Sequence, residues 1–279
     1  MIIDDQTNFV YVADTLPLRY SNFCEEFLKL LNSNNIDLAF LKQTKDVWAV
    51  DYMPIQIGKD DFVQFVYEPD YLMNSIKWQK TISDVNSICN DINIRIRKSN
   101  LIVDGGNVIK WHNKVIMCDK VFAENKSTNP KKLIKELENI FQVDSIIFIP
   151  THPDDIIGHA DGMVRFLDGE TVIVNDFSKE NRLDYVRFLS ALNNAKLNII
   201  EIPYNPYTNN KLIDANGIYI NYLQLKGNII LPLFGLKEDE KVVELFEKLF
   251  PKTKISGINS CDIAVNGGIL NCITWNILK

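Results

Sequence analysis

The sequence predicts an α/β fold in which five similar units form a ring around a central channel. Two β-like runs separated by an amphipathic helical segment recur five times along the 279 residues. Each unit is followed by a shorter segment with one conspicuous polar residue, and these polar residues lie 51 to 62 positions apart. A repeat of this length that closes into a ring brings equivalent positions together at its axis.

The strands of each unit are predicted from short runs that are rich in β-branched and aromatic residues. The first strand of each unit is predicted over 9–15, 62–68, 114–119, 171–176 and 228–234. The second strand is predicted over 36–42, 92–98, 145–150, 197–203 and 254–259.

The helices between these strands are predicted from apolar residues spaced three and four apart. Leu133 and Leu137 belong to one such stripe, and Val242 and Phe246 to another. Asn129 precedes a proline, which is a typical start of a helix. The predicted helices span 21–34, 75–91, 129–141, 181–194 and 238–250.

A tail follows each unit, and the tails carry the residues of chemical interest. The tails span 46–57, 101–111, 156–166, 216–225 and 262–275. Their marker residues are Asp51, Asp104, His159, Asn221 and Cys272. We expect each tail to be a strand that lines the channel, with its polar residue facing inward. The repeat favours one domain over residues 1–279 rather than two.

Composition limits the classes of function. With 46% hydrophobic residues the chain can bury a large core, and its net charge of −6 argues against nucleic acid as a partner. Five scattered cysteines without a CxxC pair are typical of a reducing cytoplasm. The first residues contain two acids where a signal peptide would be basic. No apolar run approaches the ~18 residues that span a bilayer, so we expect a cytoplasmic protein without a membrane partner.

The tails would bring three carboxylates, one imidazole and one thiol to the channel. A metal site is one interpretation, although the tails contain neither HxxxH nor CxxC, and only His159 is a strong nitrogen ligand. A papain-like cysteine hydrolase is another, but it needs the cysteine at a helix N-terminus, and Cys272 follows a β-like run.

A third interpretation explains the excess of carboxylates. Two aspartates can hold a planar guanidinium with paired N–H···O bonds, and the bound cation favours the thiolate of a neighbouring cysteine. Cys272 would then attack the guanidinium carbon. His159 would protonate the departing nitrogen and later deprotonate a water.

Four of the tail segments resemble motifs of a known family. These segments are DVWAVDYMP, DGGN, GHADGMVRF and GGILNCITW. In this order they are similar to motifs of the agmatine deiminases and bacterial peptidylarginine deiminases, guanidine-modifying enzymes of the pentein superfamily. The resemblance covers the chain from about residue 9 to its end and implies a propeller of five ββαβ units around a central active site.

The resemblance also implies a role for each matching residue. Cys272 matches the nucleophile that forms a covalent amidino-thioether, and His159 matches the general acid and base. Asp51 and Asp161 match the carboxylates that hold the guanidinium, while Asp104 takes the place of the acid that supports the histidine. The family needs neither a metal nor another cofactor for this chemistry.

Three further residues are candidates for contact with the substrate. Trp48 would stack on the cation, Arg165 would bind a substrate carboxylate or order the acids of the site, and Asn107 belongs to the DGGN motif. Three residues depart from the family pattern: Val50 replaces an arginine, Asp104 replaces the more usual glutamate, and Asn271 replaces the histidine common in agmatine deiminases.

The sequence therefore predicts a hydrolase that converts a small cationic guanidine into a ureido product and ammonia. Agmatine, giving N-carbamoylputrescine for putrescine biosynthesis, is the first candidate, and peptidyl or free arginine the second. Four other interpretations stay open: an amidinotransferase, a dimethylarginine-type hydrolase, an inactive guanidinium binder, and a non-catalytic ring like the ribosome anti-association factor. The sequence is also compatible with a homo-oligomer.

Overall fold

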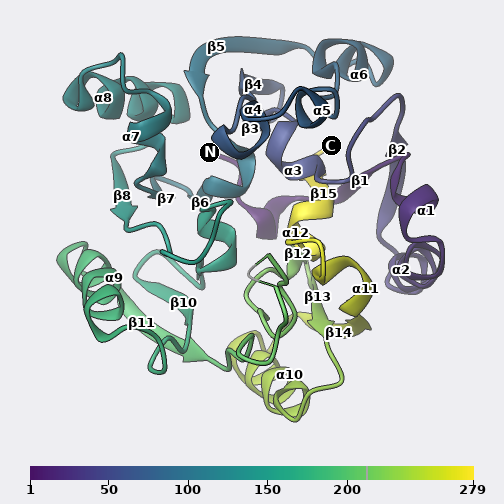
Figure 1. The fold of residues 1–279 in the computed structure, drawn as a ribbon. Helices are drawn as coiled ribbons and strands as arrows, with labels where there is room; N and C mark the ends of the chain where they lie inside the picture. The colour runs from purple at the N-terminus through teal and green to yellow at the C-terminus, as the bar shows by residue number, and fades with distance from the viewer. Residues whose placement is uncertain (212) are drawn as a thin grey trace.

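The computed structural model, which describes residues 1–211 and 213–279, contains five three-stranded sheets arranged around a centre (Figure 1). In each sheet the middle strand pairs antiparallel with one neighbour and parallel with the other. The predicted ring of five strand–helix–strand units is confirmed. The division into domains stays a prediction.

The strands occupy three positions in their sheets. The inner strands lie nearest the centre of Figure 1 and are β15 (Thr274–Ile277), β3 (Ile55–Gly58), β6 (Ile109–Trp111), β9 (Val164–Phe166) and β12 (Leu223–Leu225). The middle strands are β1 (Phe9–Ala13), β4 (Asp61–Val66), β7 (Lys114–Cys118), β10 (Thr171–Asn175) and β13 (Asn228–Leu233). The outer strands are β2 (Asp37–Leu41), β5 (Ile96–Ile102), β8 (Ser145–Ile149), β11 (Asn198–Ile202) and β14 (Lys254–Asn259).

The two ends of the chain close the ring. Strand β15 pairs antiparallel with β1, with Trp275 opposite Tyr11. On its other side β1 pairs parallel with β2. The C-terminal motif is therefore held at the centre by the first strand of the chain, as a closed repeat requires.

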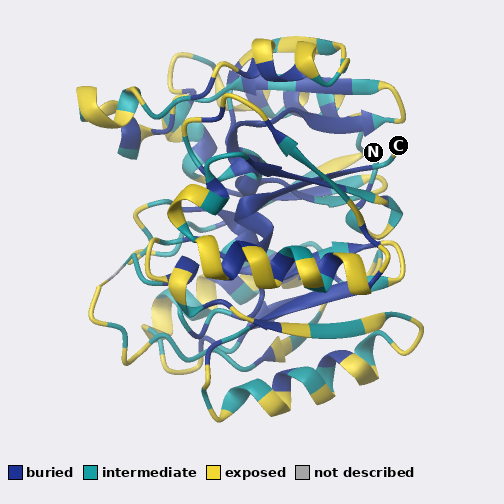
Figure 2. Cartoon of the chain, turned by 90° about the vertical axis from the view of Figure 1, so that its right-hand side faces the viewer, coloured by how far each residue is buried: buried dark blue, intermediate teal, exposed yellow. Residues whose placement is uncertain are grey.

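A helix connects the middle strand of each sheet to its parallel outer strand, because parallel neighbours need a long crossover. These helices are α2 (Ser21–Ser33), α6 (Val85–Asp91), α8 (Pro130–Phe141), α9 (Arg182–Asn194) and α10 (Glu238–Leu249), all at the periphery of Figure 1. Their outer faces are exposed, whereas the middle strands are largely buried (Figure 2). The outer strands are mostly half-buried or exposed.

Helix α8 shows how these helices are held. Leu133, Leu137 and Phe141 form a fully buried stripe at a spacing of four. Each such side chain contributes roughly 1.5–3 kcal/mol when it leaves water. Asn129 caps the helix by accepting a hydrogen bond from the backbone of Lys131, as its position predicts.

The second unit differs from its prediction. The single helix expected over 75–91 is two helices, α5 (Ile76–Gln79) and α6, because Asp84 caps a new helix start by accepting from the backbone of Ser87. The strand expected over 92–98 begins only at Ile96 and runs to Ile102. Another short helix, α4 (Asp70–Met73), precedes α5.

The tails also differ from their prediction. None of the five marker residues lies on an inner strand. Asp51 and Cys272 lie on short helical turns, Asp104 and His159 directly precede such turns, and Asn221 lies two residues before β12. These turns are α3 (Ala49–Tyr52), η2 (Gly105–Asn107), η3 (Ala160–Gly162) and α12 (Leu270–Ile273). A strand turns alternate side chains to opposite faces, whereas a helical turn lets neighbours such as Asn271 and Cys272 reach one partner.

The remaining short elements are η1 (Asp4–Gln6), α1 (Leu16–Arg19), α7 (Lys120–Glu124) and α11 (Cys261–Ala264). All five cysteines are free thiols, as their scattered positions predict. None of the helices in the described residues is both long and apolar enough to cross a bilayer.

Candidate active site

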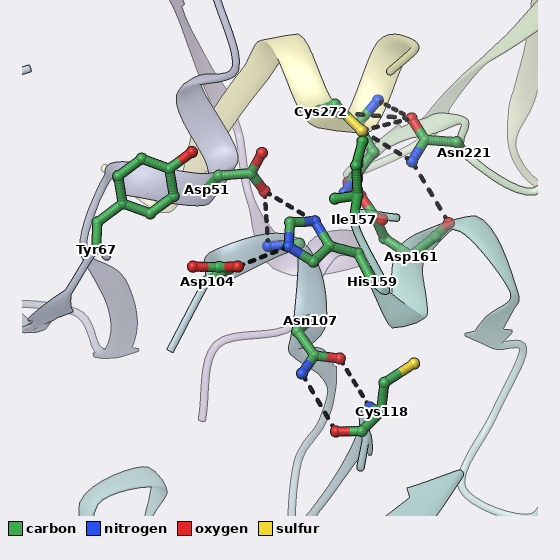
Figure 3. A network of polar contacts seen from close by, with 12 residues as sticks. Asp51, Tyr67, Asp104, Asn107, Cys118, Ile157, His159, Asp161, Asn221 and Cys272 are labelled. Atoms are coloured by element: carbon green, nitrogen blue, oxygen red, sulfur yellow. Dashed lines mark hydrogen bonds and ion pairs between the residues drawn. The ribbon is translucent and has the colours of Figure 1, made fainter. Parts of the chain in front are cut away.

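The tails meet at a cavity of about 1030 Å³. Cys272, His159, Asp161 and Asp51 all line it, although they come from turns that precede the inner strands of three different sheets. Figure 3 shows these side chains converging from the short turns. Trp48 lines the same cavity and remains a candidate for stacking on a cation. The structure therefore brings the predicted nucleophile, the acid–base residue and two of the three predicted carboxylates into one cavity; the third, Asp104, contacts His159 but is not among the described residues that line the cavity.

Asp51 is held in place by the next tail. Its Oδ1 accepts a hydrogen bond from the backbone N–H of Gly106 at 3.1 Å and lies 3.4 Å from Nδ1 of His159. A β-carbon on Gly106 would lie 2.6 Å from each of these two atoms, so only glycine permits this approach. Burial raises the pKa of Asp51 to about 7, although the His159 charge opposes the rise.

His159 lies between two carboxylates. Its Nε2 is 2.9 Å from Oδ2 of Asp104, and its Nδ1 faces Asp51. Burial by itself would lower the pKa of His159, but the charge of Asp51 and the hydrogen bond to Asp104 raise it to about 9. The same hydrogen bond lowers the pKa of Asp104 despite its burial. The imidazole is therefore protonated at neutral pH, as a general acid must be.

Cys272 lies in the helical turn α12 rather than after a strand, and its side chain is only 8% exposed. Its sulfur is 3.5 Å from Oδ2 of Asp161 and 3.2 Å from Nδ2 of Asn221. Burial and the charges of Asp161 and Asp51 raise the pKa of Cys272 well above its usual range. In this structure the thiol form is favoured, and a cation placed between the carboxylates would favour the thiolate.

Asp161 is ordered by a chain of contacts that reaches the N-terminal segment. Asn271 donates to Oδ2 of Asp161 at 2.8 Å, and its own Oδ1 accepts from Nη1 of Arg165 at 3.0 Å. Nη2 of Arg165 is paired with Asp4 at 2.6 Å, and its guanidinium lies 4.7 Å from the ring centre of Tyr222.

These contacts decide between the two roles considered for Arg165. Arg165 is buried and is not among the described residues that line the large cavity. The prediction that it binds a substrate carboxylate is therefore not supported by the geometry, because Asp4 and Asn271 already occupy its guanidinium. The alternative, that Arg165 orders an acid of the site, agrees with its contact to Asn271.

Asn107 also differs from its predicted place. The side-chain amide of Asn107 makes two hydrogen bonds with the backbone of Cys118: it accepts from the N–H at 2.7 Å and donates to the carbonyl oxygen at 3.3 Å. Within the described chain it does not line the cavity. Asn107 therefore joins η2 to β7, and the structure does not support the predicted contact with substrate, because the amide faces the backbone of Cys118 outside the cavity.

The sequence did not assign several residues that the site contains. Asn221 was a marker of its tail but received no role, and Asn271 was noted only as a departure. Tyr67 and Tyr71 line the cavity and their hydroxyls lie 3.3 Å apart. Lys120 lies next to Asp104. Two signals are available in the sequence: the regular position of Asn221 in the repeat and the departure of Asn271 from the family motif, whereas Tyr67, Tyr71 and Lys120 come from segments outside the tails.

The arrangement suits nucleophilic and acid–base chemistry on a cation. Within the described residues, no group of three or more His, Cys, Asp or Glu side chains is arranged to hold a metal ion. The cavity instead combines a thiol, a protonated imidazole and two carboxylates, Asp51 and Asp161, that can accept hydrogen bonds from a planar donor.

Comparison with known proteins identifies the family. A family model described as Porphyromonas-type peptidyl-arginine deiminase matches residues 7–277. A protein named "Putative agmatine deiminase" from Photobacterium profundum is 24% identical over 234 residues, which cover 72% of this chain and 64% of that protein. One of the same name from Mycoplasma mycoides is 23% identical over 271 residues, covering 82% and 74%. For three curated relatives of this name, the chain spans less than two thirds of the relative's length.

Solved structures agree on the fold. The structure titled C. jejuni agmatine deiminase superposes with a TM-score of 0.81 at 19% identity, covering 100% of this chain and 95% of that one. The DDAH from Pseudomonas aeruginosa gives a TM-score of 0.61 at 11% identity, covering 97% and 99%. The predicted pentein fold is thereby confirmed. Since the family model covers nearly all of its length, the chain belongs to the Porphyromonas-type peptidyl-arginine deiminase family.

Proposed function

We propose that this protein is a deiminase that hydrolyses a guanidinium group to a ureido group and ammonia. The observation that carries the proposal is the place of the Cys272 sulfur, 3.5 Å from the carboxylate of Asp161 in the cavity that also contains the His159–Asp51 pair. A guanidinium held between Asp51 and Asp161 would present its carbon to this sulfur.

In the first half-reaction the bound cation favours the thiolate of Cys272, whose proton passes to solvent, and the thiolate forms a C–S bond to the guanidinium carbon. His159 gives its proton to one terminal nitrogen, the C–N bond breaks, and ammonia leaves. The result is a covalent amidino-thioether on Cys272.

In the second half-reaction, His159, now neutral, takes a proton from a water that attacks the same carbon. The C–S bond then breaks and the sulfur leaves as thiolate, while the former water oxygen becomes the carbonyl oxygen of the ureido product and its remaining proton passes through solvent to the released ammonia, giving ammonium. The sum is one guanidinium and one water giving one urea derivative and one ammonium ion, so atoms and charge balance.

Agmatine is the substrate that the wall of the cavity favours. Seven carboxylates line the cavity. Apart from histidines, the basic side chains among the described lining residues are those of Arg19 and Lys211. Arg19 is paired with Asp46 at 2.8 Å, and Arg165 is occupied outside the cavity. A substrate with a second cationic group and no carboxylate therefore suits this wall better than free arginine does.

Peptidyl arginine is the second candidate, and the large volume of the cavity favours it. Trp78, Ile156 and Tyr207 line the cavity and are each between 41% and 58% exposed, so apolar surface borders its opening. A peptide that carries the arginine could contact this surface.

Amidino transfer, the alternative reaction, would need an amine in place of the attacking water.

Ammonia release from a panel of guanidines tests the proposal. The panel contains agmatine, free arginine, an arginine-containing peptide and dimethylarginine, and agmatine is expected to react with the highest kcat/KM. Cys272→Ser is expected to abolish release and to retain agmatine binding in calorimetry; Cys261→Ser, which changes a cysteine outside the cavity, is the control. If agmatine binds but no guanidine in the panel releases ammonia, the protein is an inactive guanidinium binder and the deiminase proposal fails.

A further inference from the structure

Lys120 is a half-buried lysine behind the candidate acid–base residue. Its side chain is 10% exposed, and its ammonium makes three contacts: 3.0 Å to Oδ2 of Asp104, 3.0 Å to Oε1 of Glu124 and 2.8 Å to the carbonyl oxygen of Ile157. Charged side chains are rarely buried unless they are paired, and here two carboxylates provide the pairing. These acids also raise the pKa of Lys120, so it stays charged.

The contact with Asp104 involves one particular oxygen. Oδ2 of Asp104 lies within hydrogen-bond distance of both Lys120 and His159, at 3.0 and 2.9 Å. The other oxygen, Oδ1, is buried and has no hydrogen-bond partner among the described residues. Hydrogen bonds to the ring of His159 and to the ammonium therefore determine together which oxygen faces the imidazole.

The contact with Ile157 reaches His159 along the chain. Ile157 is two residues before His159, and Gly158 between them has a φ of +71°, which favours glycine. Lys120 thus holds the carboxylate that contacts the ring and also the backbone that carries the ring. Both contacts act on the orientation of His159.

Lys120 does not belong to the described lining of the cavity, whereas Tyr71 does. The Lys120 ammonium lies 5.4 Å from the centre of the Tyr71 ring, and the same ring lies 6.4 Å from the His159 ring. Lys120 is therefore placed to act through Asp104 and Ile157 rather than on a bound guanidinium, which would also be repelled by its charge.

We propose that Lys120 is a positioning residue, whose ammonium holds Oδ2 of Asp104 and the Ile157 carbonyl so that His159 keeps the orientation needed for proton transfer. The inference rests on the proposed function for the role of His159, but the geometry that Lys120 maintains can be measured without turnover. Lys120 and His159 contact the same oxygen of Asp104. The ion pair with Lys120 therefore restrains the carboxylate that contacts the ring of His159.

The test compares Lys120→Met with Lys120→Arg, and uses Lys114→Met as the matched control. Lys114 is another half-buried lysine that donates to a loop carbonyl, that of Gly169 at 2.6 Å, without contact to Asp104 or His159. With agmatine, Lys120→Met is expected to lose roughly 10- to 100-fold in kcat, part of what a positioned acid–base group contributes. KM is expected to stay within about threefold because Lys120 does not line the cavity.

The second readout is the Nε2–H resonance of His159 in the ligand-free protein, identified by its loss in His159→Gln. In wild type this proton lies in the hydrogen bond from His159 to Asp104 and is expected to exchange slowly with water. In Lys120→Met it is expected to exchange faster, within an otherwise native spectrum, and Lys120→Arg is expected to restore both the resonance and most of kcat. Lys114→Met should leave both readouts unchanged.

If Lys120→Met does not fold, Lys120→Met/Glu124→Gln removes one positive and one negative charge together, and the same losses are expected. Wild-type kcat and an unchanged His159 resonance in either folded variant would overturn the inference. If wild type releases no ammonia from any guanidine but the resonance still changes in Lys120→Met, the proposed function fails while the positioning role stands.

Discussion

Nδ2 of Asn221 lies 3.2 Å from the sulfur of Cys272, while Oδ1 of the same amide accepts from the backbone N–H of Asn271 at 3.1 Å. One side chain thus fixes the turn that carries the sulfur and offers a donor to the sulfur itself. A donor at this place stabilises the thiolate more than the thiol.

Asn221→Ala is therefore expected to raise the pKa of Cys272 and to slow its alkylation by iodoacetamide about tenfold, since a hydrogen bond to a charged group contributes roughly 1.5–3 kcal/mol. Asn221→Asp should slow it further because it adds a negative charge. Asn228→Ala, which removes an exposed amide, serves as the control. Equal alkylation rates in wild type and Asn221→Ala would show that this contact does not affect the sulfur.

Gly106→Ala is expected to lower kcat/KM by roughly 100-fold, because the added methyl group would lie 2.6 Å from both Asp51 Oδ1 and His159 Nδ1 and would force them apart. The comparison is Gly58→Ala, whose methyl group would meet only Asp61 at an ordinary 3.6 Å. Steady-state kinetics with agmatine measure both variants. A Gly106→Ala enzyme as active as Gly58→Ala would mean that the Asp51–His159 contact is unimportant.

The pH dependence follows from the Asp51–His159 pair. His159 must be protonated to act as an acid, and its pKa of about 9 predicts loss of kcat/KM at higher pH. Asp51 must be ionised to hold the guanidinium, and its pKa of about 7 predicts loss at lower pH. We expect a bell-shaped profile between about 7 and 9, with both limbs belonging to the coupled pair.

Asp51→Asn tests this assignment. The variant removes the charge that raises the pKa of His159, so the alkaline limb is expected to move to lower pH, in addition to a large loss of kcat/KM. Residual activity with an unshifted alkaline limb would assign that limb to a group other than His159.

Asp4→Asn is expected to destabilise the protein and to weaken the site from a distance. Asp4 pairs with both Arg165 and Lys110, and without its charge the buried Arg165 loses its partner. Leaving the buried Arg165 charge without its half-buried partner is expected to cost up to roughly 3 kcal/mol, which urea denaturation would detect. Because Arg165 contacts Asn271, we also expect a lower kcat/KM. Glu25→Gln removes an exposed ion pair and should change neither quantity.

Much of the fold was predictable because its signals are local. The stripe of Leu133 and Leu137 and the cap at Asn129 lie within one helix, and both are found in α8 as expected. The helix over 75–91 was wrong because Asp84 competes as a helix start inside a continuous apolar pattern. Repeat position and motif agree for Cys272, His159 and Asp51, and Asp161 follows from the motif alone; all four line one cavity.

The five repeats, their order and the residue types of each tail can be recognised without coordinates, since apolar spacing and motif spacing are properties of neighbours in the chain. Three contacts could not be predicted in this way: Asp4 pairs with Arg165, the Asn107 amide bonds to the Cys118 backbone, and Lys120 and His159 contact the same oxygen of Asp104. These contacts depend on closure of the ring, which brings together polar atoms from distant segments, and burial then requires each charged group to find a partner.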